Sequence, residues 1–531
     1  MDILSSRWKS VFSREPPPFT DATPRTLPQA LADLLTEGCA SSVRHTLSAL
    51  MSDGQPVPIS SLVQTARAHG WSEHELQKLI AYTEFYSGQT AAAYQRVMDG
   101  GLARRDYRLF MTTCVQCYLH HRHAEGYALL KQFDPDQADD LDPGEFLAYA
   151  GYLAFTGGGS AGEATAYFDR GLDHGLISPL LAVNAYPIYV ESGQHERAAQ
   201  VRRLIHERYP DDPEAVYAVA IVELARDYYP EGFRLAEARY RMPEVARYIN
   251  PTLLLRPRWQ GESLTGQRLF IHGEQGFGDL IMMSRYLPLL TAQGAQVTLD
   301  CRVEAIPLLT HNFPDCYIIE GDLHTPIETP FDYWTGIMSL PFHLSTTADG
   351  VPASHGYLTT PPEQQTYWRG RVGECACRPT PRIGLAWSGN LEHRADRRRS
   401  IPFDKIASIL LEHQSVSFFA LQTSVPGHCP ANLLDLSEEL ITLADTAALI
   451  DEMDLVITVD TSIVHLAGAL GKPTWLLLPS RYEWRWGLSG ERNHWYDTVR
   501  VLRQEVQGDW DSLLAQVFGE RLTQFVASQS G

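Results

Sequence analysis

The hydrophobic pattern of this 531-residue chain changes its period once, near residues 249–266, and that change limits the folds open to it. From about residue 29 to 248 the apolar residues recur at helical spacing, and short Gly, Asp or Pro turns separate the helices. Beyond residue 266, short β-rich runs alternate with helical segments. Such alternation predicts parallel sheets joined by crossover helices. We therefore expect a flexible tail over 1–28, a helical domain over 29–248, a linker over 249–266 and α/β structure after it.

The helical half carries an internal repeat. A glycine that ends one helix is followed five positions later by a small residue, and these pairs are Gly88 and Ala93, Gly159 and Ala164, and Gly193 and Ala198. The last two small residues are 34 positions apart, and Gly232 lies a further 34 positions along. The pattern resembles tetratricopeptide repeats, which place small residues where two helices touch. Such repeats stack into a solenoid whose concave face usually grips a peptide or protein, and an irregular helical domain is the alternative.

The α/β half divides into two series of strands and helices, over 267–378 and 379–531, on either side of a break that contains Pro and Cys. The simplest architecture is two Rossmann-like domains in tandem with a cleft between them. In open parallel sheets, ligands bind at the carboxyl ends of the strands. Residues that follow directly after predicted strands are therefore the candidates for a binding site.

Composition narrows the range of partners and compartments. The balance of 44 Lys and Arg against 64 Asp and Glu gives a net charge of −20, which repels nucleic acid and anionic membrane. We find no secretory signal and no apolar run of about eighteen residues, so no membrane insertion is expected. The eight scattered cysteines fit a cytoplasmic protein with reduced thiols. The pair Cys114 and Cys117 has redox or zinc spacing, but its helical context favours buried thiols.

Residues 272–279, with the sequence HGEQGFGD, form the first candidate segment. They follow a predicted strand and precede an apolar helix. The glycines permit a tight turn, and a helix N-terminus offers free amide groups to an anion. Neither the dinucleotide-binding spacing nor the Gly-Lys-Ser/Thr of a P-loop is present. Asp279, near the helix start, is either a functional carboxylate or an ordinary N-terminal cap.

The second candidate segment, 382–403, contains the most basic run of the chain. A predicted strand leads into the polar turn 388–390, and Arg394 and Arg397–Arg399 follow. Guanidinium groups suit phosphate oxygens, and a cluster of them in so acidic a protein indicates an anionic partner. A solvated loop is the alternative.

The third candidate segment, 455–479, begins with an apolar strand that ends at Asp460. Thr461 and Ser462 start a helix that carries His465 on the same face as Thr461. Hydroxyl and amide groups at this helix start predict a second anion site. A helix cap with a buried, hydrogen-bonded histidine would explain much of the same pattern.

In combination, GFGD at 276–279 and DTSIVHLA at 460–467 resemble the heptosyltransferase type of GT-B glycosyltransferase. The chain is still more similar to bacterial proteins that join tetratricopeptide repeats to such a domain. The motifs shared with them lie in order over about 250–512: His272-Gly273-Glu274-Gln275, Trp387-Ser388-Gly389-Asn390, Arg397–Ile401, Gly468–Pro479, Trp484-Arg485-Trp486 and Trp495-Tyr496. The resemblance implies a helical solenoid followed by two Rossmann-like domains, with a nucleotide sugar in the cleft.

The resemblance also implies roles for single residues. Asp279 would be the catalytic base that activates the acceptor hydroxyl. Donor binding is expected from Gln275, Gly276, Gly278, Ser388, Gly389, Asn390, Arg398, Arg399, Gln422, Asp460, Thr461, Ser462 and His465. Contacts with sugar or acceptor are expected from His272, Glu274, Trp484 and Trp486, and core packing is the alternative for the two tryptophans. Arginines and a helix N-terminus would replace a divalent metal, and no cofactor is expected besides the donor substrate.

Two positions depart from the heptosyltransferase pattern. Arg397–Arg399 stand where that pattern often has a lysine, so the identity of the donor does not carry over. Ser462 replaces the more usual glycine, which a helix start tolerates.

The expected function is therefore inverting, metal-independent transfer of a sugar to an acceptor hydroxyl. The repeats suggest a protein acceptor such as a flagellin, pilin or adhesin, glycosylated on Ser or Thr in the cytoplasm. Two other functions stay open: a scaffold or sensor built on a degenerate sugar-nucleotide domain, and an enzyme that builds a polysaccharide or lipid-linked glycan. The sequence predicts neither the sugar, the nucleotide nor the oligomeric state.

Overall fold

A computed structural model of the chain describes residues 59–68, 70–86, 89–104, 106–119, 122–135, 142–375, 381–389, 396–427, 429–480 and 483–529. The predicted tail 1–28, the start of the predicted helical domain and Asn390 lie outside these residues, as do the side chains of Arg397 and Arg398. The chain groups into two compact units, Met1–Val219 and Ala220–Gly531.

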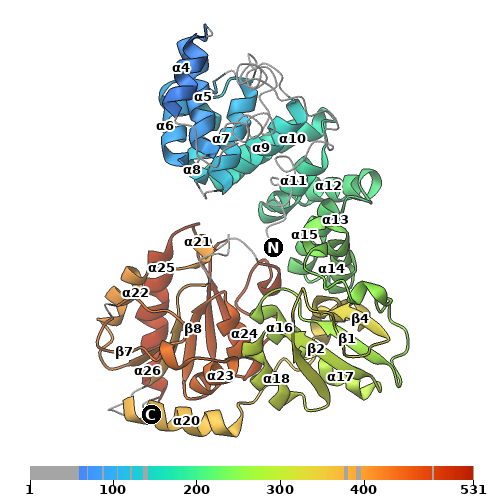
Figure 1. The fold of residues 1–531 in the computed structure, drawn as a ribbon. Helices are drawn as coiled ribbons and strands as arrows, with labels where there is room; N and C mark the ends of the chain where they lie inside the picture. Colours follow the sequence, from blue (N-terminus) through green and yellow to red (C-terminus); the bar gives the residue numbers. More distant parts are fainter. Residues whose placement is uncertain are drawn as a thin grey trace. The chain divides into compact units, whose positions relative to one another are not determined.

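The described residues of the first unit form helices, some of which are buried over most of their surface and some along a single stripe. Most residues of α9 and α11 are buried, whereas α10 and α12 bury one face each. Asp142, Ser160 and Ser178 cap three of these helices through their side-chain oxygens. The helices, coloured blue to green in Figure 1, are α4 (Ile59–Ala68), α5 (Glu73–Tyr86), α6 (Thr90–Asp99), α7 (Tyr107–Leu119), α8 (His123–Gln132), α9 (Pro143–Thr156), α10 (Ala161–Asp173), α11 (Pro179–Glu191) and α12 (His195–Arg208).

The predicted repeat is visible in the helix starts. Helices α10 and α12 begin 34 residues apart, and α14 (Tyr229–Ala236) begins a further 34 residues along. Ala164 and Ala198, the small residues singled out by the pattern, are buried. Gly232 has the same role in the second unit, because a Cβ atom there would lie 2.7 Å from Leu224. The helices thus pair at the spacing that the sequence predicts.

The two cysteines with zinc-like spacing are buried in α7. Cys114 and Cys117 are free thiols with no exposed surface. Burial raises the pKa of Cys117 to about 12 and that of Cys114 well above its ordinary value. Both thiols therefore stay protonated, as their helical context predicts.

The second unit begins earlier than the predicted end of the helical domain at residue 248. Helix α13 (Pro213–Ala225) spans the boundary, and Tyr229 and Phe233 of α14 belong to the main core of the α/β region. The segment predicted as a linker also packs there, since Leu253 and Trp259 are buried and Trp259 N donates to the carbonyl of Trp334. The short helices of this stretch are η2 (Glu237–Arg241), α15 (Pro243–Ala246) and η3 (Leu253–Leu255).

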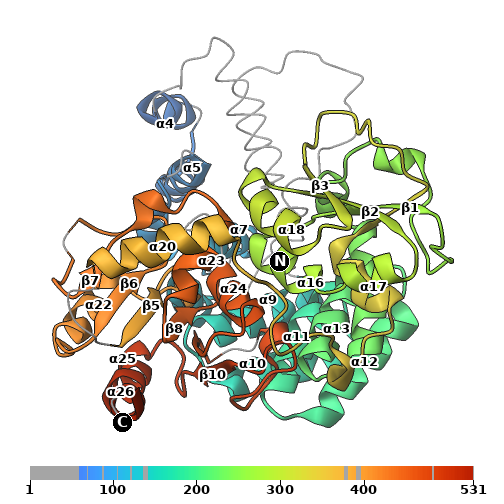
Figure 2. The same ribbon diagram turned by 90° about the horizontal axis from the view of Figure 1, so that it is seen from below.

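The first sheet of the described residues has four parallel strands in the order β3-β2-β1-β4. Figure 2 shows β3, β2 and β1 side by side. The buried strand β1 pairs on both sides, and Ile271 lies opposite Leu299 and Thr335. The strands are β1 (Arg268–His272), β2 (Gln296–Cys301), β3 (Cys316–Glu320) and β4 (Tyr333–Gly336), and the helices are α16 (Phe277–Ser284), α17 (Leu287–Ala292), α18 (Ile306–Asn312), α19 (Leu340–His343) and α20 (Pro362–Cys375).

The second sheet has six parallel strands among the described residues, in the order β10-β9-β8-β5-β6-β7. Its central strand β8 is buried throughout, as expected for a parallel strand covered on both faces. The strands are β5 (Arg382–Ala386), β6 (Ser417–Ala420), β7 (Leu433–Leu434), β8 (Leu455–Val459), β9 (Thr474–Leu478) and β10 (Val499–Arg503). The helices are α21 (Asp396–Arg399), α22 (Phe403–Leu410), α23 (Leu443–Asp451), α24 (Ser462–Ala469), α25 (Trp510–Leu514) and α26 (Leu522–Gln529).

The predicted fold class is confirmed for the described residues: helices come first, and two parallel α/β domains follow in tandem. Every strand pairing in both sheets is parallel. The glycine-rich turn of the first candidate segment follows β1, the polar turn of the second follows β5, and the helix start of the third follows β8. Each therefore lies at the carboxyl end of a strand.

Candidate functional site

The glycine-rich segment forms a tight turn between β1 and α16. Gln275 has a φ of +70°, a left-handed backbone conformation that residues other than glycine rarely adopt. Both Gln275 and Gly276 are exposed. Gly276 is the N-cap of α16, so Asp279 lies in the first helical turn without being the cap. The side chain of Asp279 is therefore free to contact another element.

Asp279 forms an ion pair with Arg485, which follows β9 in the other α/β domain. The Arg485 Nη2 atom donates to Asp279 Oδ1, and Nη1 of the same guanidinium donates to Glu483. Burial by itself raises the pKa of Asp279, but the charge of Arg485 outweighs burial and holds the pKa below its ordinary value. Burial, with a further contribution from Asp460, raises the pKa of Glu483 to about 7. Two carboxylates with opposite pKa shifts thus share one arginine.

The starts of α16 and α24 touch each other. A Cβ atom added at Gly278 would lie 2.7 Å from Cδ2 of His465, so only glycine fits at this contact. Thr461 is the N-cap of α24, and its hydroxyl accepts from the amide of Ile463 at 3.3 Å. The contact brings the first and third candidate segments into one site.

His465 is buried and held in place by aromatic side chains. Its Nδ1 lies 3.1 Å from the hydroxyl of Tyr496, and its ring stacks on Trp486 with centroids 5.2 Å apart. Burial, together with the nearby charge of Arg485, lowers the pKa of His465 to about 3. The imidazole is therefore neutral at physiological pH.

Trp484 and Trp486 lie in the core in this structure. They are 6% and 1% exposed, respectively. Trp486 Nε1 donates to Asp460 Oδ1 at 3.0 Å, and Trp484 packs edge-on against Trp495. The two tryptophans thus pack beneath the site, and Trp486 also lines a pocket.

The turn after β5 is cross-linked by polar side chains. The amide of Gly389 donates to Asp396 Oδ1 and to Ser400 Oγ, both at 3.1 Å. Arg399 also contacts Asp396, and its Nη1 donates to the carbonyl of Asp460 at 2.7 Å. Arg399 therefore joins the second candidate segment to the third.

Gln422, which is expected to contact the nucleotide base, instead hydrogen-bonds to the turn after β5. Its Oε1 accepts from the amides of Trp387 and Ser388 at 2.7 and 2.9 Å. Its Nε2 donates to the Ser388 hydroxyl and the Ser424 carbonyl. The side chain thus fixes the backbone that follows β5.

His272 and Glu274 are held by partners that the sequence did not indicate. His272 Nδ1 lies 3.0 Å from Asp300 Oδ2, and although burial opposes the charged form, this contact raises the pKa of His272. Glu274 pairs with the buried Arg239 at 2.7 Å and accepts from the amide of Met338. Both side chains anchor the glycine-rich turn.

The structure thus brings most of the predicted residues into one region and adds several that sequence reasoning missed. The added residues are Arg485, Glu483, Asp396, Asp300 and Arg239. Arg485 lies inside the Trp-Arg-Trp motif, which was noted for its rings alone. The other four carried no motif that could have indicated their roles.

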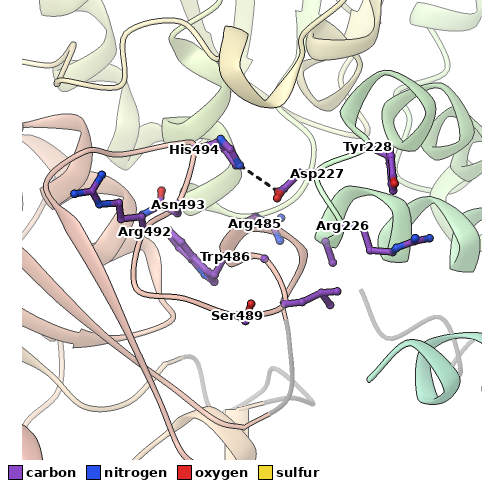
Figure 3. Close-up of a pocket in the computed structure, with 12 residues that line it drawn as sticks. Arg226, Asp227, Tyr228, Arg485, Trp486, Ser489, Arg492, Asn493 and His494 are labelled. Atoms are coloured by element: carbon purple, nitrogen blue, oxygen red, sulfur yellow. Dashed lines mark ion pairs between the residues drawn. The ribbon is translucent and has the colours of Figure 1, made fainter. Parts of the chain in front are cut away.

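Two pockets flank this region. The first has a volume of about 310 Å³ and is lined by the turn after α13 and by the loop that contains Arg485 and His494. Figure 3 shows Arg492, Asn493 and His494 on that loop and Arg226 and Tyr228 on the helical turn, with His494 paired to Asp227 at 3.4 Å. The second, of about 360 Å³, is lined by residues 423–425 and 435–439, which follow β6 and β7.

Among the described residues, no helix is long and apolar enough to cross a membrane. No group of three or more His, Cys, Asp or Glu side chains in the same part of the chain is arranged to hold a metal ion.

Comparison with known protein families gives one match. The model of glycosyltransferase family 9 (heptosyltransferase) matches residues 403–492. This segment contains Gln422, Asp460–His465 and Arg485, whereas Asp279 and Arg399 lie outside it.

Individual proteins are similar over longer stretches. Protein FlbA of Caulobacter vibrioides is 29% identical over 358 residues, which cover 60% of this chain and 57% of FlbA, so the chain spans less than two thirds of that relative. The ADP-heptose LPS heptosyltransferase II of E. coli is 14% identical with a TM-score of 0.36, covering 50% of this chain and 100% of that structure. A variant of the O-GlcNAc transferase of Thermobaculum terrenum is 13% identical with a TM-score of 0.28, covering 86% and 94%. The chain therefore carries a heptosyltransferase-like family 9 segment in its second α/β domain, behind a helical region of 34-residue spacing.

Proposed function

We propose that the chain is a glycosyltransferase that moves a sugar from a nucleotide sugar to an acceptor hydroxyl, with Asp279 as the general base. The observation that carries this proposal is the contact between Gly278 on α16 and His465 on α24. Each of these helices begins at the carboxyl end of a parallel sheet, where ligands bind. The contact joins the carboxylate of the glycine-rich turn to an anion-binding helix start inside the family 9 segment.

The donor diphosphate would bind at the start of α24. The first amides of that helix and the Thr461 hydroxyl offer donors, and the helix dipole favours negative charge there. Arg399 already reaches the Asp460 carbonyl next to this point, so its guanidinium lies beside the expected phosphates. In this proposal the arginines and the helix start take the place of a divalent metal.

Arg485 would couple the breaking of the glycosyl–phosphate bond to the transfer of the acceptor proton to Asp279. While it pairs with Asp279, the carboxylate has a lowered pKa and is a weak base. As the glycosyl–phosphate bond breaks, negative charge grows on the diphosphate, and Arg485 would shift its hydrogen bonds from Asp279 to phosphate oxygens. That exchange raises the pKa of Asp279 when it must take the proton.

The proposed step is a single displacement. The acceptor oxygen forms a bond to the anomeric carbon, its proton passes to Asp279, and the nucleoside diphosphate leaves with the electron pair. Attack opposite the leaving group inverts the configuration at the anomeric carbon.

Glu483 is a second carboxylate that could take the proton. Its pKa is raised to about 7, which suits a base near neutral pH better than the lowered pKa of Asp279. We assign the base to Asp279 because it follows the glycine-rich turn that resembles the heptosyltransferase loop. Asp279→Asn and Glu483→Gln variants separate the two assignments.

The pocket after β6 and β7 suits the nucleoside of the donor. It lies at the carboxyl ends of two strands of the second sheet, and Asp435 and Glu438 among its lining residues offer carboxylates to ribose hydroxyls. Gln422 hydrogen-bonds to Ser388 and to the carbonyl of Ser424, which lines this pocket, and would shape the pocket rather than contact the base directly.

A protein acceptor completes the proposal. Helix pairs at 34-residue spacing are the framework of solenoids that grip peptides, so the first unit would recruit a protein such as a flagellin, pilin or adhesin. Modification would fall on Ser or Thr side chains in the cytoplasm.

The first test measures donor binding. A nucleotide sugar that binds the folded chain should raise its melting temperature, so a thermal-shift screen across nucleotide sugars identifies the donor. Asp279→Asn should keep that shift and lower the transfer rate by about 10²–10⁴-fold. Asp511→Asn, at an ion pair on the surface, is the matched control and should keep both the melting-temperature shift and the transfer rate.

The second test identifies the acceptor class. Intact-mass analysis of flagellins, pilins and adhesins co-expressed with the chain should reveal a mass gain equal to one sugar. Donor binding without any transfer would favour the scaffold, and sugar found only on lipid or polysaccharide would favour a glycan-building enzyme. Full activity in Asp279→Asn with loss in Glu483→Gln would move the base to Glu483.

A further inference from the structure

The pocket beside Arg485 is rich in arginine. Three arginines line it, Arg226, Arg485 and Arg492, against one carboxylate, Asp227. The chain as a whole carries a charge of −20 and repels anions at long range, so binding of an anion here depends on these arginines.

The three arginines differ in how many ion pairs and other contacts they already make. Arg485 is held by Asp279 and Glu483. Arg226 lies 3.5 Å from Glu223 and stacks over the ring of Tyr228 at 5.0 Å, and 31% of its side chain is exposed. Arg492 is exposed, and its side chain has no ion pair or hydrogen bond with any residue in the described ranges. Two guanidinium groups are thus available to an incoming anion.

The helical side of the pocket is held in an unusual conformation. Asp227 has a φ of +65°, a backbone conformation that residues other than glycine rarely adopt. Its carboxylate pairs with His494 across the pocket. The turn presents Tyr228 with 53% of its surface exposed. Tyrosine and arginine are among the residue types most enriched at the positions that contribute most to binding in protein interfaces.

The pocket also lies next to the reacting groups without including the expected diphosphate site. Arg485 in its lining binds Asp279, and Trp486 binds Asp460. The predicted phosphate-binding residues Ser388, Thr461 and Ser462 do not line it. A ligand in this pocket would therefore reach Asp279 through Arg485, the residue that it would share with the donor phosphates.

We propose that this pocket binds an acidic stretch of the acceptor, so that Asp or Glu residues near the modified Ser or Thr contact Arg226 and Arg492. This inference rests on the proposed function and names a feature of its acceptor. The volume of about 310 Å³ is at the small end of ligand pockets, roughly 300–1,000 Å³, and suits a few side chains of an extended segment. Paired arginine forks recognise carboxylates with defined geometry.

The test uses the full chain and two fluorescein-labelled serine peptides of equal length, one with aspartates around the serine and one with lysines. Fluorescence anisotropy gives the dissociation constant of each peptide. The unmodified protein should bind the aspartate peptide more tightly, and Arg226→Glu and Arg492→Glu should each weaken that binding by about tenfold. The double variant should prefer the lysine peptide. Arg256→Glu, an equal charge change at an exposed residue outside the pocket, should leave both constants unchanged.

Three outcomes would overturn the inference. Equal binding of the two peptides by the unmodified protein is the first, and unchanged binding in the double variant is the second. The third is displacement of the aspartate peptide by inorganic pyrophosphate, if the double variant also loses pyrophosphate binding, because the pocket would then be a phosphate site.

A thermal-shift measurement with nucleotide sugars keeps this inference separate from the proposed function. The double variant should show the same shift as the unmodified protein, because Arg226 and Arg492 are not among the proposed donor-binding residues. If no nucleotide sugar shifts the unmodified protein, the proposed function fails, whatever the peptides do.

Discussion

Arg485 donates a hydrogen bond to Asp279 from a position 206 residues away in sequence, and the pair joins the two α/β domains at the proposed catalytic carboxylate. The guanidinium holds the pKa of Asp279 low, so Arg485→Met should raise that pKa. If Asp279 must be ionised to act as base, the acid limb of the pH–rate profile should move to higher pH. Arg485→Lys, which keeps the charge, should show a smaller shift.

The measurement is transfer rate against pH with the donor found by thermal shift. A profile in Arg485→Met with its acid limb unmoved and only its height reduced would mean that Arg485 contacts substrate without setting the pKa of Asp279.

Gly278 is the point where the two helix starts touch. Gly278→Ala would place a Cβ atom 2.7 Å from His465, and relieving such overpacking costs about 1–3 kcal/mol. The higher helix propensity of alanine stabilises the folded state by about 1 kcal/mol at most, so a net loss of stability is expected. Gly276→Ala is the matched control, because a Cβ atom there meets nothing within 4 Å and the φ of −95° suits alanine. Thermal melting of both variants should show a drop for Gly278→Ala alone.

Gln422 holds the turn after β5 through two backbone amides. Gln422→Leu would leave the amides of Trp387 and Ser388 without their acceptor, at about 1–3 kcal/mol each when buried. The variant should be less stable and should bind the donor more weakly. Gln422→Glu keeps the acceptor oxygens and should restore most of the stability. Similar melting temperatures for the Leu and Glu variants would show that the amides find other partners.

His465 and Glu483 should give the unfolding free energy opposite dependences on pH. His465 is neutral when folded, with a pKa of about 3 against 6.5, so the unfolded chain binds more protons between these values and stability falls as the pH drops from 6.5. Glu483 has a pKa of about 7 when folded against 4.5, so the folded chain binds more protons and stability falls as the pH rises from 4.5 to 7.

Urea unfolding between pH 4 and pH 8 separates the two contributions. His465→Asn should lose less stability on acidification than the unmodified chain, and Glu483→Gln should lose less on the rise towards pH 7. The same pH dependence in the unmodified chain and in both variants would mean that folding neither lowers the pKa of His465 nor raises that of Glu483.

The sequence predicts the elements of this fold better than it predicts the partners of single residues. The strand before Gly276 and the helix after it follow from hydrophobic period and turn residues, which act over a few positions. The carboxylate of Asp279 was identified by its motif, whereas Arg485 was not, because nothing in a local pattern says which side chain returns from 206 residues away. Glu274 shows the same limit: its place beside the glycine-rich turn suggested a ligand contact, but Arg239, 35 residues earlier, takes both of its oxygens.

That buried pair supports a final prediction about stability. Arg239 is 1% exposed and donates to Glu274, and Glu274 also accepts from the amide of Met338. Arg239→Met would leave Glu274 buried without its cation, which costs about 3–5 kcal/mol. Arg268→Met is the control, because its ion pair with Asp332 is 43% and 32% exposed and pairs of that kind contribute at most about 1 kcal/mol.

Urea unfolding followed by the fluorescence of the tryptophans in the second unit measures both losses. The double variant Arg239→Met with Glu274→Gln should recover part of the loss, since it removes the unpaired charge along with its partner. If the Arg239 and Arg268 variants lose equal amounts, the buried pair contributes no more than a surface pair, and the glycine-rich turn must be held by its hydrogen bonds to Asp300 instead.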